Sequence, residues 1–435
     1  MSSDAQGPLP KKRRVSAGAS ASPSPLSPDL LRSIDSRRLD FDSEKICSVS
    51  LSRMDVHGCL VCGRYFRGCG ERTPAFLHSV NDGHRLFVSF DSGRVVLLPE
   101  NTVVDVDAQD SSLLRDIQYA VSPVYTHEQI ACFPQRCRDA ALAKPYYNGF
   151  VGLTKSSSSN TTFVTTVVHA LAHIAPVRDY LLLLDNSSDV PPLVRTLSTV
   201  VKKLWSPHLF KPHVNPDELI NYLLVEHPQV MQRGSADPRT FYVWIVNALC
   251  KQDRALARVL KHSCRGKLAR GNKHIPFWNL TLPLPDTSVF KDSSDINEQP
   301  QVELRTLLQD RFASGTGPVL DKSGMPRFLV LSIGRFSPGE FPVKSRNQTV
   351  VSFADVLELD VGGSAEKYRL AANIVHAPKK NTHDIGRDDE SSWRVQLPNT
   401  ATHEWVELDS TVTTPRDANL LFLSETYMQV WQRCE

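Results

Sequence analysis

Apolar and polar side chains alternate in the first third of the chain, and apolar side chains recur at helical spacing further along. Residues 85–90 alternate as a half-buried strand does, and residues 94–98 return after the turn-forming stretch Asp91–Gly93. This pattern predicts a β-hairpin over residues 85–98. Helically spaced apolar residues after the polar start Gln109–Ser111 predict a helix over 110–121.

The second part of the chain places predicted helices before predicted strands. Apolar residues with a period near 3.6 predict helices over 162–175, 193–204, 217–226 and 239–258. Short runs rich in branched and aromatic side chains predict strands over 328–333, 369–375, 393–397 and 404–408, with polar loops at 286–300 and 377–391. Segregated helices and strands are typical of an α+β domain, which we place at residues 149–435.

The N-terminal residues have a different composition from the rest. Residues 1–38 contain few bulky apolar side chains and many Ser and Pro, so we predict a disordered tail. Within this tail, Lys11, Lys12, Arg13 and Arg14 form a compact run of cations that resembles a nuclear localisation signal and predicts a nuclear protein. The alternative is that these cations are only solvated and bind no import receptor.

Length, charge and cysteine usage narrow the class of protein. The chain has 435 residues, a formal net charge of +3 and nine cysteines. It is long enough for two or three domains, and we find neither a secretory leader nor an apolar run of a membrane span. Scattered cysteines in odd number indicate a reducing compartment. The small net charge argues against nucleic-acid binding by the whole chain.

One basic stretch departs from this average. The segment Lys261–Lys273 holds five Lys or Arg, which makes it a candidate for local RNA contact. The alternative is a solvated helix end and loop.

Two cysteines and two histidines in the segment 39–143 have the spacing of a metal site. Cys59 and Cys62 are separated by two residues, the turn-former Gly63 follows, and His78 and His84 come next. A Cys-x-x-Cys turn can grip one ion, and two imidazoles complete a closed tetrahedral ligand set. We therefore predict one structural zinc held by these two cysteines and two histidines. The alternative is a reduced thiol pair beside surface histidines.

A second motif begins at Gly152–Leu153, continues through Asn160–Thr165 and enters the predicted helix that holds His169–Leu171. This order resembles the cysteine box of ubiquitin-specific proteases, which are papain-like cysteine peptidases, with Thr162 at the position of the nucleophile. A threonine hydroxyl is far less acidic than a thiol, and the start of a helix cannot ionise it at neutral pH. We therefore predict that Thr162 serves as a helix N-cap.

The histidine box of that family is also altered. Tyr368–His376 resembles its first half, and Ser391–Val395 resembles the strand that carries the catalytic base, which puts Ser392 at the position of the base. Asp409 is the retained third member of the triad. His383 is an alternative base, which we disfavour because no aromatic strand follows it. The resemblance therefore implies a protease fold without its catalytic groups, and not an enzyme.

The zinc segment resembles the UBP-type zinc finger that precedes some of these protease domains. Pro74 and Ser79 replace a histidine and the tyrosine that the family uses at the tail of ubiquitin. The resemblance therefore implies the zinc site but puts ubiquitin binding in doubt. We place the disordered tail at residues 1–38, the zinc finger at 39–143 and the inactive protease-like domain at 149–435.

A zinc finger directly followed by a protease fold without its catalytic groups resembles the inactive ubiquitin-specific-protease homologues of the spliceosome. The stretches Leu39–Asp42, Lys203–Pro207 and Leu423–Trp431 carry the same resemblance. It implies a nuclear, non-catalytic scaffold of pre-mRNA splicing that contacts proteins of the U4/U6-U5 tri-snRNP and supports its assembly or its state before activation. Peripheral snRNA contact is a further candidate. The alternatives are a deubiquitinase that uses Thr162 and a catalytically silent ubiquitin-binding adaptor.

Overall fold

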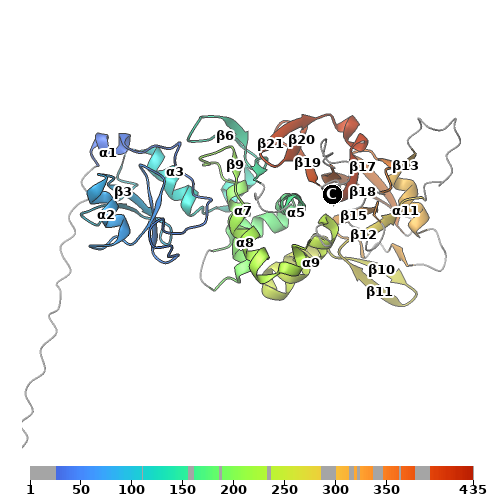
Figure 1. The fold of residues 1–435 in the computed structure, drawn as a ribbon. Helices are drawn as coiled ribbons and strands as arrows, with labels where there is room; N and C mark the ends of the chain where they lie inside the picture. Colours follow the sequence, from blue (N-terminus) through green and yellow to red (C-terminus); the bar gives the residue numbers. More distant parts are fainter. Residues whose placement is uncertain are drawn as a thin grey trace, which may run out of the picture.

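A small sheet, a layer of helices and a large sheet follow one another along the molecule (Figure 1). The computed structural model describes residues 26–109, 111–154, 161–185, 189–232, 237–285, 300–312, 318–320, 324–336, 346–361, 364–377 and 392–434. No helix in these ranges is both long and apolar enough to cross a lipid bilayer.

The N-terminal unit (residues 26–121) is built on a five-stranded antiparallel sheet in the order β2–β1–β3–β4–β5. Its strands are β1 (Val56–Cys59), β2 (Tyr65–Arg67), β3 (Leu86–Ser89), β4 (Val95–Leu97) and β5 (Thr102–Val103), and its helices are α1 (Pro28–Arg32), α2 (Pro74–Asn81) and α3 (Ser112–Val121). The predicted hairpin is confirmed as β3–β4 and the predicted helix as α3. Ser111 caps α3 by accepting the Leu114 N–H, and Leu114 and Ile117 face the core.

A helical layer follows a short connecting region. The connecting region contains α4 (His127–Ala131), β6 (Arg136–Arg138), β7 (Pro145–Tyr147) and β8 (Gly152–Leu153). The layer consists of α5 (Thr162–Ala172), α6 (Ala175–Leu183), α7 (Pro192–Leu204), α8 (Asp217–Glu226), α9 (Pro238–Gln252) and α10 (Arg254–Cys264), with β9 (His213–Val214) and the 3-10 turn η1 (Pro228–Val230) between them.

Of the four helices predicted in this layer, one ends early and one is divided in two. The helix predicted over 162–175 ends at Ala172, and a separate helix begins at Ala175 with Pro176 in its first turn. The single helix predicted over 239–258 is wrong. It breaks at Asp253, whose carboxylate accepts the N–H groups of Ala255 and Leu256 at 2.8 and 3.1 Å and so starts a new helix.

The main sheet has the order β12–β15–β22–β18–β19–β20–β21, with β17 paired to β18. Its strands are β12 (Leu280–Pro283), β15 (Phe328–Gly334), β17 (Val356–Val361), β18 (Ser364–His376), β19 (Trp393–Asn399), β20 (Glu404–Asp409), β21 (Val412–Arg416) and β22 (Glu425–Arg433). All neighbours are antiparallel except β12 and β15. The four predicted strands are confirmed within β15, β18, β19 and β20.

Smaller elements extend this sheet. They are the three-stranded sheet of β10 (Gly266–Arg270), β11 (Lys273–Phe277) and β14 (Val319–Leu320), the pair β13 (Gln301–Glu303) and β16 (Val350–Ser352), α11 (Leu304–Phe312) and the 3-10 segment η4 (Ala418–Leu423). The predicted loops 286–300 and 377–391 lie almost wholly outside the described residues.

Helix α5 lies at the centre of the molecule. All its residues are buried, and it packs against α9 and against β19 of the main sheet. A helix that carries no charged side chain can be enclosed in this way at little cost, because it has no ion to desolvate. The N-terminus of α5 therefore meets the main sheet at the start of β19.

A polar and aromatic seam joins the N-terminal unit to the helical layer. Lys203, near the end of α7, donates from Nζ to Asp42 Oδ1 at 2.8 Å and to the Phe41 carbonyl at 3.0 Å. The Phe41 ring meets Phe210 edge-on at 5.2 Å between centroids, and Lys211 pairs with Asp40. Since these contacts are largely buried, they fix the N-terminal unit on α7.

Candidate metal centre and degenerate catalytic site

The four predicted zinc ligands come from three neighbouring elements of the N-terminal unit. Cys59 ends β1, Cys62 lies in the turn that follows, His78 is on α2 and His84 directly precedes β3. Gly63 closes the turn at φ +74°, and a Cβ there would lie 2.1 Å from the Arg38 carbonyl oxygen. Only glycine therefore permits the chain to turn here, and the turn brings both thiols to one side.

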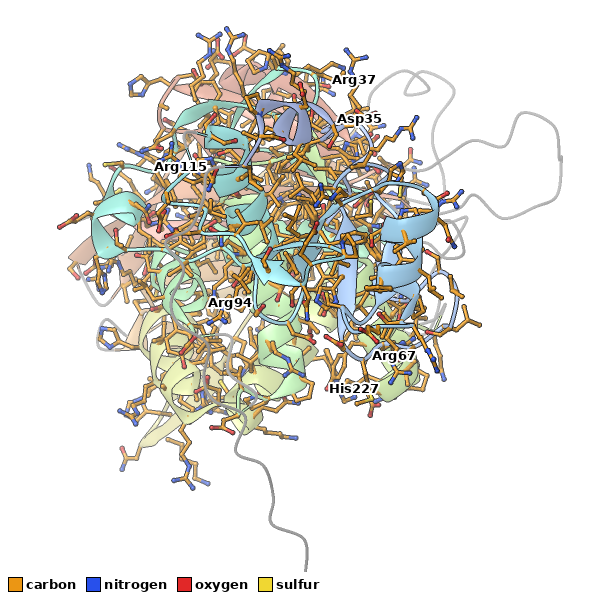
Figure 2. The ribbon with its side chains drawn as sticks, turned by 90° about the vertical axis from the view of Figure 1, so that its left-hand side faces the viewer. Asp35, Arg37, Arg67, Arg94, Arg115 and His227 are labelled. Carbon is orange, nitrogen blue, oxygen red and sulfur yellow. The ribbon has the colours of Figure 1, made fainter. Side chains whose placement is uncertain are left out.

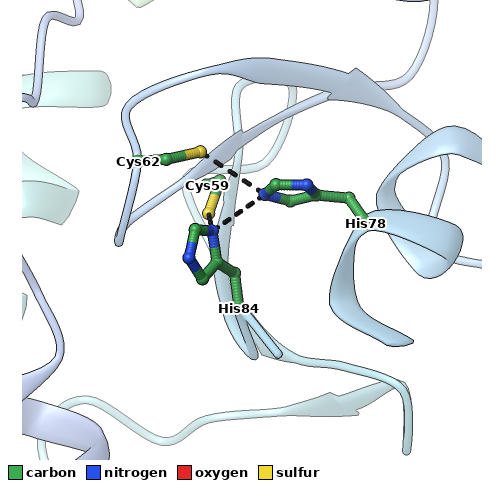
Figure 3. Close-up of side chains that lie close together, drawn as sticks. All are labelled: Cys59, Cys62, His78 and His84. Atoms are coloured by element: carbon green, nitrogen blue, oxygen red, sulfur yellow. Dashed lines mark hydrogen bonds between the residues drawn. The ribbon is translucent and has the colours of Figure 1, made fainter. Parts of the chain in front are cut away.

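The ligand atoms converge to the spacing of a tetrahedral metal site (Figure 3). Cys59 Sγ lies 3.7 Å from His84 Nδ1, Cys62 Sγ lies 3.4 Å from His78 Nε2, and the two imidazole nitrogens are 3.0 Å apart. All four ligand atoms lie within 4.8 Å of one another. Zinc bonds of normal length in a tetrahedron separate such atoms by roughly 3.3–3.8 Å, so these residues fit a zinc ion.

The surroundings of His78 orient it for this role. Asp82 Oδ2 lies 2.5 Å from His78 Nδ1 one turn along α2, so Nδ1 carries the proton and Nε2 offers its lone pair to the metal. The Phe66 ring stacks on the imidazole at 4.1 Å. A hydrogen bond shared with Cys59 lowers the pKa of the Cys62 thiol to about 4, and this outweighs burial, so one thiolate is ready to bind.

Thr162 lies where the resemblance places a nucleophile, at the first helical residue of α5. Its Oγ1 accepts the backbone N–H of Trp393 at 3.1 Å, and the residue is only 3% exposed. The prediction that Thr162 is the N-cap is wrong. The N-cap is Thr161, and Thr162 is turned instead toward the first residue of β19. This contact holds the start of α5 against the sheet and leaves the hydroxyl no access to solvent.

Ser392 and Asp409 lie at the start of β19 and at the end of the neighbouring strand β20. Ser392 directly precedes β19 and is 5% exposed. Asp409 ends β20, and its Oδ2 lies 3.0 Å from Nε of Arg394 on β19. Gly152 of β8 approaches the turn after Asp409 so closely that a Cβ would lie 1.9 Å from the Ser410 carbonyl oxygen. The fold thus brings the three motifs together, and the Asp409 carboxylate forms a salt bridge with Arg394.

A buried carboxylate next to Asp409 extends this salt bridge. Glu407 accepts Gln396 Nε2 at 2.9 Å and Arg416 at 2.7 Å, and Arg394 lies 3.3 Å away. Burial raises the pKa of Glu407, but these hydrogen bonds and charges outweigh it and hold the pKa below its usual range. Glu407 therefore links side chains of β19 and β21 across β20.

Comparison with known proteins decides the family. Residues 152–429 match the model of the ubiquitin carboxyl-terminal hydrolases, and residues 47–109 match the zinc finger found in ubiquitin-hydrolases and other proteins. The chain belongs to the ubiquitin carboxyl-terminal hydrolase family. Its α+β architecture, with a UBP-type zinc finger before a papain-like protease fold, is confirmed, and the Cys59, Cys62, His78 and His84 cluster is the structural zinc site of that finger.

Within this hydrolase family, the chain is similar to proteins of pre-mRNA splicing. It is 36% identical over 93% of both chains to the pre-mRNA-splicing factor SAD1 of Saccharomyces cerevisiae. It is 31% identical to the probable mRNA-splicing protein ubp10 of Schizosaccharomyces pombe, over 93% of this chain and 88% of that protein. The crystal structure of an essential yeast splicing factor matches with TM-score 0.82 and 37% identity, over 94% of this chain and all (100%) of the other. The predicted resemblance to splicing members of the family is confirmed.

A more distant match shares the fold alone. The SAGA DUB module bound to monoubiquitin matches with TM-score 0.50 and 14% identity, over 91% of each chain.

The structure also shows what the sequence patterns missed. Asp82, which orients His78, and the Trp393 N–H, which binds Thr162, were not predicted. The position of Asp82 four residues after a helical histidine was the one available signal. Two predicted features, the cations Lys11–Arg14 and the alternative base His383, lie outside the described residues.

Proposed function

We propose that the chain is a non-catalytic scaffold in pre-mRNA splicing that associates with the U4/U6-U5 tri-snRNP through protein–protein contacts. The observation that carries this proposal is the similarity to SAD1, which extends over 93% of both chains and so includes the zinc finger, the seam and the protease-like fold together. A protease frame of this family holds a folded protein domain, and such a surface can hold a protein partner after cleavage is lost.

The geometry of the degenerate site supports the loss of catalysis. A thiol protease needs a thiolate, a base and a group that orients the base. Here Thr162 is buried and accepts a backbone hydrogen bond, Ser392 has no basic nitrogen, and Asp409 pairs with Arg394. Loss of single triad members costs on the order of 10⁴–10⁶ in kcat in well-studied proteases, and here two positions differ.

Recovery of partners from nuclear extract tests the scaffold. The tagged full-length chain should bring down tri-snRNP proteins with the U4, U6 and U5 snRNAs, and Thr162→Ala should bring down the same set, since no chemistry is required. A tag-only protein is the background control. An eluate of the wild-type chain without tri-snRNP proteins would contradict the proposal.

A ubiquitin-coumarin hydrolysis assay tests the loss of catalysis. We expect wild-type, Thr162→Ala and Thr162→Cys chains to release coumarin no faster than buffer, because a new thiol would still lack a base at Ser392 and a free carboxylate at Asp409. Hydrolysis by the wild-type chain that Thr162→Ala abolishes would instead establish an active deubiquitinase.

Nuclear localisation follows from the same proposal. Lys11, Lys12, Arg13 and Arg14 are the residues that we propose to be read by the import machinery. Replacing all four with Gln should move a fluorescent fusion from the nucleus to the cytoplasm, whereas four Lys→Arg or Arg→Lys exchanges should leave it nuclear. Nuclear accumulation of the Gln variant would show that another segment or a partner carries the signal.

A further inference from the structure

Positive charge is concentrated in one short stretch of the chain. Residues 251–273 contain eight Lys or Arg and one Asp, a net charge of +7, whereas the whole chain has a net charge of +3. All the other residues together therefore have a net charge of −4. The small net charge of the whole chain is therefore the sum of one basic region and an acidic remainder.

Helix α10 presents part of this charge along one side. Arg254, Arg258 and Lys261 are exposed and stand four and three residues apart, which places them on one face. The opposite face is buried through residues such as Leu256 and Leu260. With a rise of about 1.5 Å per residue, the three cations follow one another at intervals of roughly 4.5–6 Å along the helix.

The β10–β11 hairpin adds three exposed cations to this charge. It follows α10 after Arg265 and lies at the lower edge of the molecule in the view of Figure 1. Arg270 and Lys273 are exposed and paired across the turn at Gly271, so they share one side of the hairpin, and the exposed Lys267, three residues before Arg270, lies on the other side. We call Arg254, Arg258, Lys261, Lys267, Arg270 and Lys273 the basic face.

Within the part of the chain that the structure describes, no cation of the basic face has a carboxylate partner within 4.0 Å. The one acidic residue of the stretch, Asp253, is used as the N-cap of α10 and accepts the Tyr180 hydroxyl at 2.7 Å. Like charges three or four residues apart repel one another on a helix, so the basic face gains stability when a partner supplies negative charge.

We propose that the basic face binds the phosphodiester backbone of RNA without reading its base sequence. This goes beyond the scaffold function, which rests on protein contacts. Two observations favour RNA over an acidic protein. The cations of α10 form a row rather than a cluster around a pocket, and phosphates of a nucleic-acid strand also form a regular row.

The apolar side chains of the region complete the argument. Protein partners are held by buried aromatic or apolar anchors, and across residues 251–277 the one exposed large apolar side chain is Ile275, at 40%. Phe277 is half-buried, and Trp278 is half-buried under the Arg265 guanidinium at 5.5 Å from its ring centroid. The region thus offers charge for phosphates but neither an apolar anchor for a protein nor an exposed Phe, Tyr or Trp ring for stacking on bases.

Fluorescence anisotropy with the full-length chain and a labelled 20-base-pair RNA hairpin tests the proposal. Two triple variants remove half of the basic face each, Arg254→Gln/Arg258→Gln/Lys261→Gln and Lys267→Gln/Arg270→Gln/Lys273→Gln. At about 100 mM salt, each should weaken binding at least tenfold and reduce the slope of log K against log salt by roughly 2–3, about 0.7–0.9 for each lost phosphate contact. A hairpin of different sequence should bind equally well.

A matched control removes three exposed cations from the N-terminal unit, Arg67→Gln/Arg94→Gln/Arg115→Gln (Figure 2). It makes the same change in net charge and should alter RNA affinity less than twofold. Equal weakening by the control and the basic-face variants would overturn the proposal, as would wild-type binding weaker than about 10 µM at 50 mM salt. Equally tight, equally variant-sensitive binding of poly-glutamate would assign the face to acidic protein instead. Unchanged circular dichroism melting verifies that the variants are folded.

Discussion

Asp82 and Thr162 each make a polar contact at the end of a helix. Asp82 orients the imidazole of a zinc ligand, and Thr162 accepts a backbone N–H from the first residue of β19. The first interaction orients a ligand of the metal site, and the second holds the start of α5 against the main sheet. Their surroundings, more than their residue types, determine what these side chains do.

The role of Asp82 can be measured through zinc affinity. Asp82→Ala removes the acceptor of His78 Nδ1 and should weaken zinc binding about 10–100-fold, measured by competition with a chromophoric chelator. Glu71→Ala is the matched control, since Glu71 is an exposed acidic residue of the same unit, and its zinc affinity should equal that of the wild type. Equal affinities of all three proteins would show that Asp82 does not orient His78.

At this scale the sequence predicted residue types better than their partners. The four zinc ligands could be predicted because the chemistry restricts their identity and their spacing. The partner of Thr162 could not, because Trp393 is 231 residues away and contributes a backbone group, which leaves no trace in its side chain. The N-cap prediction failed by one residue for a related reason, since Thr161 and Thr162 have the same side chain and only the backbone geometry separates them.

Helix α5 contains the buried His169 and is capped at its C-terminus by a second histidine, His173. Burial lowers the pKa of His169 to about 3 and, with the positive charge of Arg178, that of His173 to about 4. Both side chains are therefore neutral in the folded protein at pH 5–7, whereas in the unfolded chain they titrate near 6.5. Below that pH the unfolded state binds more protons, so stability falls as the pH decreases from 6.5 toward 4.

Urea unfolding at pH 7 and pH 5, with saturating zinc, measures this effect. Each buried histidine should lower the unfolding free energy by about 2 kcal/mol between these pH values. In His173→Gln, the unfolding free energy should fall by about 2 kcal/mol less between pH 7 and pH 5 than in the wild type. The control His127→Gln alters an exposed histidine and should retain the full dependence. Identical pH profiles for wild type and His173→Gln would show that His173 is not neutral inside the fold.

Helices and strands were predicted correctly where apolar residues kept one spacing over the whole element. α8 has the predicted ends, and α7 begins one residue before the predicted start. The break between α9 and α10 was missed because the apolar positions continue in helical spacing across Asp253, which ends one helix and caps the next. The first half of β18 was missed because Glu366 and Lys367 are charged, and this half is held by cross-strand pairing with β17.

At the scale of the whole molecule, two stretches that carried the family resemblance in the sequence are in contact in the fold. Leu39–Asp42 and Lys203–Pro207 meet in the seam between the N-terminal unit and α7. Neither stretch identified the other as its partner in the sequence. Phe41 and Lys203 are 162 residues apart, and only the folded chain brings them together. The buried Lys203 beside the half-buried Asp42 carboxylate is the part of the seam that tolerates least change.

Removal of Lys203 tests how firmly the seam holds. Lys203→Met leaves Asp42 partly buried without its cation and should cost about 3–5 kcal/mol. Limited proteolysis should then cut between the N-terminal unit and the helical layer, and urea unfolding should separate into two transitions. In a double-mutant cycle, Asp42→Asn should cost little more once Lys203 is Met. Additive costs would show that the two residues do not act as a pair.

The seam has a consequence for any assembly that touches both ends of the chain. With the two units fixed in one orientation, the first contact made by a large partner brings the second contact within reach at high effective concentration, with no further loss of rotational freedom. Two weak attachments can then act as one strong one, and they fail together when the joint between the units is loosened.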